Sequence, residues 1–290
     1  MPELPEVEVL ARHLAPLLRG QKIRGVQVRR AKVLHPTAVS EFESGLLGAR
    51  FNDVSRRAKF LRFDLTSKAG QPFLLLGHLG MTGRMYLLPK TTPLPKHAAV
   101  ILDLGKWRFV YEDTRYFGRL TLEVTSLAQL GPEPLSGDFN VADFTAALKR
   151  SVQPIKVKLL DQSLVAGIGN IYASEALFRA RLSPQTRSNR LRREEVRRLR
   201  LAIRRTLADA ISRGSTLPLN YGPGGSRDGL FYFGRADGAP DYYEERLLVY
   251  DRAGKPCRRC GTEIRRSIQA ARRTYDCPTC QRGPKERKSV

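Results

Sequence analysis

The 290-residue sequence has few cysteines, few acidic residues and no long hydrophobic run. No apolar stretch approaches the roughly 20 residues that a membrane-spanning helix needs. The first residues, MPELPEVEVL, contain neither a basic leader nor a cleavage site, so we expect a cytoplasmic protein. All four cysteines lie at or after Cys257, which in a reducing compartment indicates a metal site rather than disulfides. A chain of this length can bury a core without such crosslinks and is long enough for two domains.

The shortage of acids leaves a large positive charge. Lys and Arg number 51 against 28 Asp and Glu, which gives a formal net charge of +23 and a pI near 10.5. Between Thr186 and Gly214 there are ten arginines and three acids, and from Lys255 onward there are eleven Lys or Arg and three acids. So positive a field favours binding to a polyanion. Nucleic acid is the commonest one, and a membrane surface or an acidic protein is the alternative.

Hydrophobic spacing divides the chain into regions of different type. An amphipathic pattern predicts a helix over residues 4–18, with Pro5 in its first turn. Short strand-like runs follow between Lys22 and Val124 and predict a β-sandwich or barrel. They are KIRGVQVRR at 22–30, KFLRFDL at 59–65, FLLLGHLG at 73–80, GRMYLL at 83–88, AAVILDL at 98–104, WRFVYED at 107–113 and RLTLEV at 119–124. Helical patterns recur at residues 141–151, 155–160, 169–180 and 194–212. The segment 215–243 is rich in Gly, Pro and aromatic residues and predicts a long loop or hairpin.

The cysteines form two C-x2-C pairs separated by sixteen residues, at Cys257, Cys260, Cys277 and Cys280. Each pair can present two thiolates to one tetrahedral Zn²⁺ ion. Four thiolates complete the coordination shell, so the ion would be structural and would fold a segment that is too short to fold alone. An iron-sulfur cluster is the alternative. Arginines between the two pairs are suited to binding phosphate.

Pro2 and the acids that follow it open the chain. Removal of the initiator methionine would expose a secondary amine that can attack a sugar C1′ and form an iminium ion. Terminal amines ordinarily have a pKa of about 7.7 to 8.0, so a sizeable fraction is neutral at neutral pH. Proline at this position is otherwise a processing signal or a helix lead-in. Acids in a first helical turn, such as Glu3, Glu6 and Glu8, otherwise complement the helix dipole.

Seven motifs occur in order: MPELPEVE, RRAKFL at 56–61, HLGMTG at 78–83, DTRYFG at 113–118, LGPEPL at 130–135, LLDQSLVAGIGNIYASEALF at 159–178 and the four-cysteine segment. Together they resemble the formamidopyrimidine-DNA glycosylase family from Met1 to about Gln281. The related endonuclease VIII branch typically begins with Gly where this chain has Leu4, which favours the purine-directed branch. The resemblance implies a bifunctional DNA glycosylase and abasic-site lyase of base excision repair. It would remove 8-oxoguanine and formamidopyrimidines through a Schiff base, followed by β,δ-elimination.

The resemblance also implies an α+β multidomain architecture. We expect an N-terminal catalytic β-sandwich with flanking helices at residues 1–130. A helical helix-two-turn-helix DNA-binding domain would follow at 131–243, with a lesion-capping loop at about 215–243. A four-cysteine zinc finger and a basic tail would occupy 244–290. Duplex DNA carrying a damaged base would run through the cleft between the two halves. We expect a nucleoid-associated monomer with one structural zinc ion and no redox cofactor or catalytic metal.

The resemblance assigns four catalytic residues. Pro2 would be the nucleophile, and Glu3 would be the acid that protonates the deoxyribose ring oxygen. Glu6 would be a supporting carboxylate or water holder, with a helix-capping role as the alternative. Lys59 lies in what reads as a strand and would reach the phosphate or the damaged nucleotide near the reactive centre.

The DNA contacts come from the resemblance too. Three residues would fill the space left by the extruded base, with the arginine facing the orphan cytosine: Met81, Arg115 and Phe117. By composition alone the first and last would be core residues, but flanking glycines favour exposed turns. Four residues would bind DNA around the lesion, mainly through phosphates: His78, Lys156, Asn170 and Arg272.

Two departures from the family pattern leave alternatives open. Tyr116 stands where many relatives carry a second arginine, which removes a phosphate contact that the arginine-rich helical region could replace. The segment 215–243 is longer than usual, and its aromatic residues could stack on a base or cover a small core. The same scaffold could therefore act on oxidised pyrimidines, hydantoins or other lesions. A non-catalytic damaged-DNA-binding protein is the rival from another class, although intact Pro2, Glu3 and Lys59 argue against it.

Overall fold

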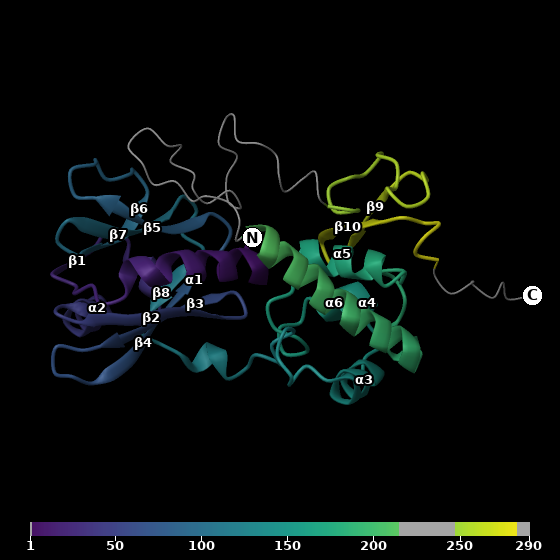
Figure 1. The fold of residues 1–290 in the computed structure, drawn as a ribbon, viewed down its shortest axis with the longest axis horizontal. Helices are drawn as coiled ribbons and strands as arrows, with labels where there is room; N and C mark the ends of the chain where they lie inside the picture. Colours follow the sequence, from purple (N-terminus) through teal and green to yellow (C-terminus); the bar gives the residue numbers. More distant parts are fainter. Residues whose placement is uncertain (1, 215–246, 283–290) are drawn as a thin grey trace, which may run out of the picture. The chain divides into compact units, whose positions relative to one another are not determined.

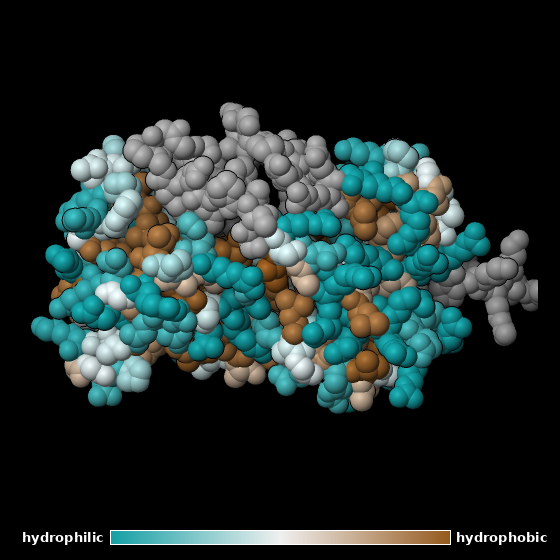
Figure 2. Space-filling view, in the orientation of Figure 1, coloured by the Kyte–Doolittle hydropathy of each residue, from teal (hydrophilic) through white to brown (hydrophobic). Residues whose placement is uncertain are grey.

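The structure, a computed structural model, describes residues 2–214 and 247–282. These residues fall into two compact units, one reaching to Ala128 and the other comprising Gln129–Ser212 and the residues from Leu247 onward. The predicted lesion-capping loop at 215–243 and nearly all of the basic tail lie outside the described residues. Among the described helices, none is long and apolar enough to cross a membrane. Hydrophilic side chains cover most of the face shown in Figure 2, and hydrophobic residues reach it in separate patches.

The first unit contains two antiparallel sheets of four strands each (Figure 1). Its strands are β1 Gly25–Val28, β2 Arg50–Arg57, β3 Phe60–Thr66, β4 Pro72–His78, β5 Gly83–Pro89, β6 Ala98–Asp103, β7 Trp107–Asp113 and β8 Arg119–Thr121. One sheet has the order β2-β3-β4-β8, and the other has the order β1-β6-β7-β5. Short helices η1 Ala31–Leu34, α2 Val39–Leu46 and η2 Thr125–Leu127 connect or flank them.

Alternating apolar residues explain why the two sheets pack face to face. In β3 the buried positions alternate with half-buried ones, so one face of the strand is apolar. The ring of Phe109 on β7 contacts Phe63 and Phe51 of the opposite sheet, with centroids 5.5 and 6.4 Å away. The core therefore lies between the sheets, which confirms the predicted sandwich. The runs singled out in the sequence omit β2, where only Phe51 and Val54 are buried.

Helix α1, Leu4–Leu18, is confirmed with its predicted bounds and packs against β2 and β3. It begins with a capping box. The backbone N–H of Glu3 donates to Oε2 of Glu6 at 2.8 Å, and the Glu3 carboxylate accepts the backbone N–H of Glu6. Pro5 occupies the first turn, where a missing N–H costs nothing. The apolar face of the helix enters the sandwich core.

The helices of the second unit are α3 Val141–Lys149, α4 Ile155–Leu159, α5 Asn170–Arg179, η3 Ser188–Arg190 and α6 Arg193–Gly214. The four helices predicted in this region are confirmed as α3, α4, α5 and α6, and each end lies within two residues of its predicted position. Three arginines of α6 hold carbonyl groups of the same unit. Arg198 donates to Ala180, Arg200 donates to Phe139, and Arg204 donates to two carbonyls that precede α3 in the sequence. Part of the local arginine excess therefore packs the unit.

The second unit also contains a β-hairpin, formed by β9 Arg265–Gln269 and β10 Arg272–Asp276. The connecting residues Ala270 and Ala271 have φ of +46° and +57°, a conformation that glycine and asparagine adopt more readily. Strand β10 packs against α5. Side chains of both elements share a small core with the loop before the hairpin, which includes Phe178, Val249, Ile264 and Tyr275.

Candidate functional site

Pro2 and Glu3 are buried immediately before α1. The capping box fixes the backbone beside Pro2, because the Glu6 carboxylate accepts the N–H of Glu3. The capping role that the sequence left as the alternative for Glu6 is therefore present. A free nitrogen at Pro2 would face the positive end of the helix dipole, which favours its neutral form. The arrangement holds the Glu3 carboxylate, on the residue that follows the candidate nucleophile, at the N-terminus of α1.

Lys59 lies in the two-residue turn between β2 and β3, not within a strand as its motif suggests. The preceding residue, Ala58, has φ of +53°, a region that side-chain-bearing residues rarely occupy. Nη1 of Arg56 donates to the carbonyl of Ala58 at 3.2 Å, and its Nε donates to Oε2 of Glu8 at 2.8 Å. Arg56 thus connects the turn that carries Lys59 to the helix that follows Pro2 and Glu3.

The position of Glu8 in the sequence suggests only an interaction with the helix dipole, but the structure shows that it also forms two ion pairs. Its carboxylate accepts Nε of Arg56 and Nε of Arg12, the latter at 2.7 Å. Burial would raise the pKa of Glu8, but the two guanidinium groups outweigh it and hold the pKa below its usual range. The Arg56 side chain is only 8% exposed, so water screens this pair less than a surface pair. The partners are 48 residues apart, which explains why no local pattern indicates them.

His78, at the end of β4, lies close to the Lys59 turn. Its ring centroid is 5.0 Å from that of Phe60, the residue after Lys59. The backbone N–H of Gly80 donates to Nδ1 of His78 at 3.1 Å, so this nitrogen carries no proton. Burial, and then the charges of Lys59 and Arg119, lower the pKa of His78 to about 4. His78 is therefore neutral at neutral pH, and Nε2 is its proton donor.

The structure brings Met81, Arg115 and Phe117 together at the surface, and we call these three residues the wedge. The Arg115 guanidinium lies 4.5 Å from the ring centroid of Phe117, and its Nη1 is 3.3 Å from Sδ of Met81. Met81 is 45% exposed and Phe117 is 50% exposed. Two exposed apolar side chains that both contact one arginine indicate a binding surface rather than a core. The exposed turns expected from the flanking glycines are present.

A buried carboxylate that sequence reasoning did not single out holds both wedge loops. Oδ1 of Asp113 accepts the hydroxyl of Thr82 at 2.6 Å and the backbone N–H of Arg115 at 3.1 Å. Oδ2 accepts the backbone N–H of Gly118 at 2.9 Å and the hydroxyl of Tyr111 at 3.3 Å. Burial would raise the pKa of Asp113, but these hydrogen bonds outweigh it and keep the pKa below its usual range. Asp113 opens the motif DTRYFG, which is the signal that could have identified it.

Two glycines allow the wedge loops to touch. A Cβ on Gly80 would lie 2.5 Å from the backbone nitrogen of Gly118, and Gly80 has φ of +60°. A Cβ on Gly118 would lie 2.1 Å from the hydroxyl oxygen of Tyr111. Any larger residue at either position would separate the loops. Tyr116 sits between Arg115 and Phe117 in this close arrangement.

In the second unit, Lys156 joins three elements. Its Nζ donates to Oδ1 of Asn170 at 2.6 Å, to the carbonyl of Arg273 at 2.9 Å and to Oγ1 of Thr274 at 2.7 Å. Nδ2 of Asn170 also donates to the Arg273 carbonyl, at 2.9 Å. Lys156 is 1% exposed, and its three donors point at protein oxygens. Asn170, at the start of α5, is half-buried, and Arg272 is exposed at the start of β10.

A second buried carboxylate anchors the loop before the hairpin. Glu175 on α5 accepts the backbone N–H groups of Leu248, Val249 and Tyr250 at 2.8 to 3.1 Å. Burial raises the pKa of Glu175 despite these donors. Sequence reasoning missed this residue, because an acid inside a helix gives no sign of a partner 73 to 75 residues away.

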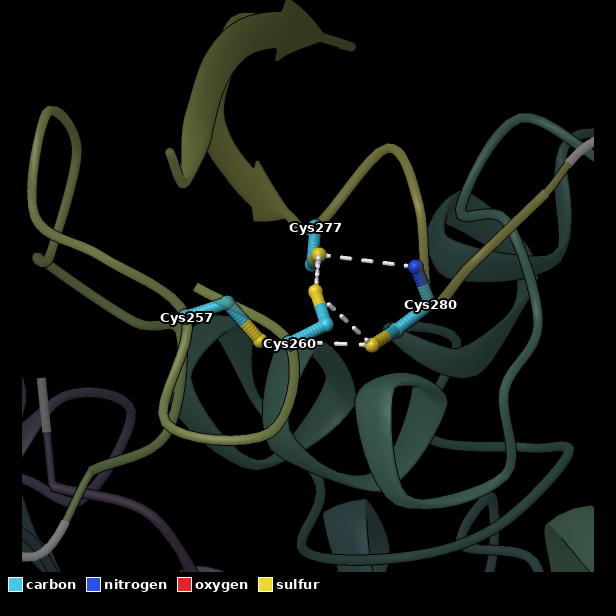
Figure 3. A group of neighbouring side chains, drawn as sticks. All are labelled: Cys257, Cys260, Cys277 and Cys280. Carbon is cyan, nitrogen blue, oxygen red and sulfur yellow. Dashed lines mark hydrogen bonds between the residues drawn. The ribbon is translucent and has the colours of Figure 1, made fainter. Parts of the chain in front are cut away.

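The four cysteines converge on one point beside β10 (Figure 3). Sγ of Cys260 lies 3.5 Å from that of Cys277 and 3.5 Å from that of Cys280, and Sγ of Cys257 lies 4.0 Å from that of Cys280. Tetrahedral coordination with Zn–S bonds of about 2.3 Å places the sulfurs about 3.8 Å apart, so the set fits the ion. Backbone N–H groups of Arg259 and Cys280 point at the Sγ atoms of Cys257 and Cys277, as thiolates require.

Family models match three consecutive parts of the chain. The N-terminal domain of formamidopyrimidine-DNA glycosylase matches residues 1–120, and the H2TH domain of the same enzyme matches residues 130–219. The zinc finger found in FPG and IleRS matches residues 254–283, and the protein therefore holds one structural zinc ion in its four-cysteine site.

Curated relatives match the chain over nearly its whole length. A formamidopyrimidine-DNA glycosylase of Xanthomonas campestris pv. campestris (strain B100) is 43% identical over 289 residues, which cover 97% of this chain and 100% of the relative. One from Thermus thermophilus is 43% identical over 288 residues, covering 97% of this chain and 98% of the relative.

Solved structures of DNA complexes have the same fold. Lactococcus lactis Fpg non-covalently bound to DNA containing an AP site has a TM-score of 0.82 at 31% identity, covering 97% of this chain and 99% of that one. The Lactococcus lactis protein with DNA containing Fapy-dG has a TM-score of 0.82 at 32% identity, covering 97% and 100%. MutM in complex with DNA containing carbocyclic 8-oxo-G has a TM-score of 0.83 at 32% identity, with the same coverage.

Proposed function

Because the chain belongs to the formamidopyrimidine-DNA glycosylase family, and is therefore a DNA glycosylase and abasic-site lyase of base excision repair, we propose that it excises oxidised purines with Pro2 as the nucleophile. The relatives whose structures contain Fapy-dG and carbocyclic 8-oxo-G support this substrate class. The observation that carries the residue assignment is the Pro2–Glu3 pair held by the capping box at the start of α1.

The proposed reaction uses one nitrogen for two steps. The Pro2 nitrogen attacks C1′ of the damaged nucleotide, and the base leaves with the electron pair of the glycosidic bond. Glu3 gives a proton to the ring oxygen, the ring opens, and an iminium ion joins Pro2 to C1′. Loss of a C2′ proton then expels the 3′ phosphate, and a second elimination expels the 5′ phosphate. Glu6 supports the site by holding the backbone N–H of Glu3.

Lys59 and His78 are the proposed contacts to the lesion strand near this centre. The Lys59 turn and His78 are close enough for the lysine charge to lower the pKa of the histidine. A neutral His78 with its proton on Nε2 can donate to a phosphate oxygen and carries no charge of its own. Arg56 is the proposed positioning residue, because it ties the Lys59 turn to α1 through Glu8.

The wedge is proposed to fill the space that the extruded base leaves. Its apolar side chains are exposed and already packed on Arg115, so little ordering is needed when they enter the base stack. Arg115 would then face the orphan base. Asp113 sets the spacing of the two wedge loops through its four hydrogen bonds.

In the second unit, Asn170 and Arg272 are the proposed phosphate contacts. The buried ammonium of Lys156 supports a different role from the predicted phosphate contact. Its hydrogen bonds orient the amide of Asn170 and fix the carbonyl of Arg273, next to Arg272. Lys156 is therefore proposed as a positioning residue for both.

The predicted division into segments 1–130, 131–243 and 244–290 forms part of the proposal. The three matching family models support it, because the boundary at 243 falls in the gap at 220–253 and the boundary at 130 lies next to the gap at 121–129. Limited proteolysis would locate the boundaries. Nucleoid association is also proposed, on the strength of the +23 charge. Imaging of a C-terminally tagged protein, which leaves Pro2 free, would test it.

Borohydride trapping tests the proposed function directly. The purified chain would be incubated with duplexes carrying 8-oxoguanine, a methyl-formamidopyrimidine, an oxidised pyrimidine or no damage. We expect a covalent adduct at Pro2 that forms most readily on the two oxidised purines, and no such adduct with Pro2→Gly on the intact lesions.

Glu3→Gln separates chemistry from binding. It should slow base release while damaged-DNA binding stays close to wild type, because an amide cannot supply the proton. Collapse of binding with unchanged excision per bound complex would show that Glu3 has another role. Trapping only on the duplex with an oxidised pyrimidine would show that the substrates are oxidised pyrimidines rather than oxidised purines. Tight binding without trapping on any duplex would favour a non-catalytic damaged-DNA-binding protein.

A further inference from the structure

An arginine outside the predicted site lies beside the wedge. Arg30 follows β1, and its Cζ lies 5.4 Å from the ring centroid of Tyr116, the residue between Arg115 and Phe117. The backbone N–H of Arg30 donates to the carbonyl of Ala99 at 3.2 Å, so the end of β1 holds this position. The side chain is exposed and, among the residues that the structure describes, takes part in no ion pair or hydrogen bond.

Tyr116 provides a fixed surface for this guanidinium. Its φ of +52° lies in the left-handed region, and its ring is half-buried against the sandwich core while Arg115 and Phe117 are exposed. The ring of His97 lies 6.5 Å away at 60°, on the segment whose carbonyl accepts the N–H of Asp113. The face of this half-buried ring attracts a cation, which localises the guanidinium charge without burying it.

The stacked guanidinium keeps its charge and all its donors. Arg115 has its guanidinium on Phe117 and Met81, so under the proposed function it would enter the duplex together with them. A DNA phosphate beside Tyr116 would need a cation other than Arg115, and the Arg30 guanidinium lies at that position. The helical arginines that the sequence offered as a replacement are partly occupied, since Arg198 holds a backbone carbonyl within the second unit.

We propose that Arg30, stacked on Tyr116, binds a phosphate of the DNA strand that carries the orphan base. The inference rests on the proposed function, because the wedge must enter a duplex for that strand to reach Arg30. Arg115 faces the orphan base, so the backbone of the same strand passes the residues adjoining Arg115. Planar guanidinium groups bind phosphate in a bidentate manner, and such contacts set the register of a protein on DNA. Arg30, two residues after the end of β1, thus supplies the positive charge that Tyr116 does not carry.

The salt dependence of DNA binding tests the contact. Loss of one phosphate contact lowers the slope of log K against log salt by about 0.9, which corresponds to about 8-fold weaker binding at 0.1 M salt. We expect this change for Arg30→Gln on a lesion duplex. Arg29→Gln is the matched control, because it removes the same charge from the adjacent exposed residue, for which no contact to Tyr116 is seen.

Moving the charge tests the position. Adding Tyr116→Arg to Arg30→Gln should restore the slope and bring the affinity within about 2-fold of wild type. The new arginine would carry its charge at the position on which the Arg30 guanidinium stacks in the wild type. Tyr116→Phe keeps the ring and should bind as wild type. Tyr116→Ala keeps every charge but removes the surface on which Arg30 stacks, so it should weaken binding in part.

Single methylphosphonate substitutions identify the phosphate. Wild type should lose about 8-fold in affinity at one position of the orphan strand, and Arg30→Gln should be insensitive there. Equal sensitivity of the two proteins at every position, or a difference confined to the lesion strand, would overturn the inference. Borohydride trapping of the control variant Arg29→Gln should match wild type. Wild type that fails to trap but shows the phosphate coupling would refute the proposed chemistry and leave the Arg30 contact intact.

Discussion

Replacing Asp113 with Asn should loosen the wedge and destabilise the first unit by a measurable amount. Each carboxylate oxygen of Asp113 accepts two hydrogen bonds, and an amide offers only one acceptor oxygen. In either orientation the NH₂ group would face one backbone N–H, which cannot accept, and one hydroxyl, which can turn to accept. One hydrogen bond is therefore lost and its backbone donor is left without a partner. A hydrogen bond to a charged group contributes about 1.5 to 3 kcal/mol, which predicts a loss of about 1.5 to 3 kcal/mol in the free energy of unfolding.

The single tryptophan makes the measurement specific to this unit. Trp107 lies at the start of β7, the strand that ends at Asp113, and is the only tryptophan of the chain. Its fluorescence during urea unfolding reports on the sandwich. Glu112→Gln is the matched control, because the neighbouring acid bonds to the hydroxyl of Tyr86 and an amide can still accept that bond. Thr82→Val removes one donor to the carboxylate and should cost about 1.5 to 3 kcal/mol.

The difference between wild type and Asp113→Asn should depend on pH with a definite sign. The folded pKa of Asp113 lies below its unfolded value of 3.8, so its ionised form stabilises the fold above that value. The stabilisation is lost as the pH falls through the folded pKa, and the two proteins should then converge. Convergence on raising the pH instead, or a difference below about 1 kcal/mol at neutral pH, would refute the reasoning about Asp113.

Three further predictions concern the other sites. Zinc removal by a chelator, or Cys260→Ser, should abolish DNA binding and leave the Trp107 unfolding transition unchanged, because the finger belongs to the other unit; a shifted transition would contradict this. Lys156→Gln should weaken DNA binding without changing the salt slope, whereas a slope reduced by about 0.9 would mean that the ammonium reaches a phosphate. An NMR titration of His78 should give a pKa of about 4, and Lys59→Met should raise it; a wild-type value near 6.5 would show that the ring is neither buried nor near these charges.

Local patterns predicted the elements that local interactions stabilise. Helix α1 has its apolar spacing, its proline and its capping acids within one stretch, so its bounds could be read directly. The metal site is equally local, since two C-x2-C pairs and a hairpin are enough to assemble it. Strand β2 was not singled out because only Phe51 and Val54 are buried in it, and it forms by pairing with β3 rather than through its own pattern.

The roles of several site residues depend on partners that are distant in the sequence. Nothing near Lys156 indicates that its ammonium bonds to Arg273 and Thr274, which are 117 and 118 residues away. The contact between Arg30 and Tyr116 joins two loops of the first unit and has no local signal. Sequence motifs therefore identified the candidate residues, while long-range hydrogen bonds show which of them already hold another part of the protein in place.

The carbonyl-bound arginines of α6 couple charge to packing in the second unit. Arg204 places one nitrogen on the carbonyls of both Pro134 and Ser136, and Arg198 reaches the end of α5. A lysine would carry the same charge but lacks the rigid planar group that presents its donors in fixed directions. Lowering the affinity for DNA by removing arginines at random would therefore loosen this unit as well. The affinity of this unit for DNA can be changed without changing its stability only at arginines that donate no hydrogen bond to a backbone carbonyl.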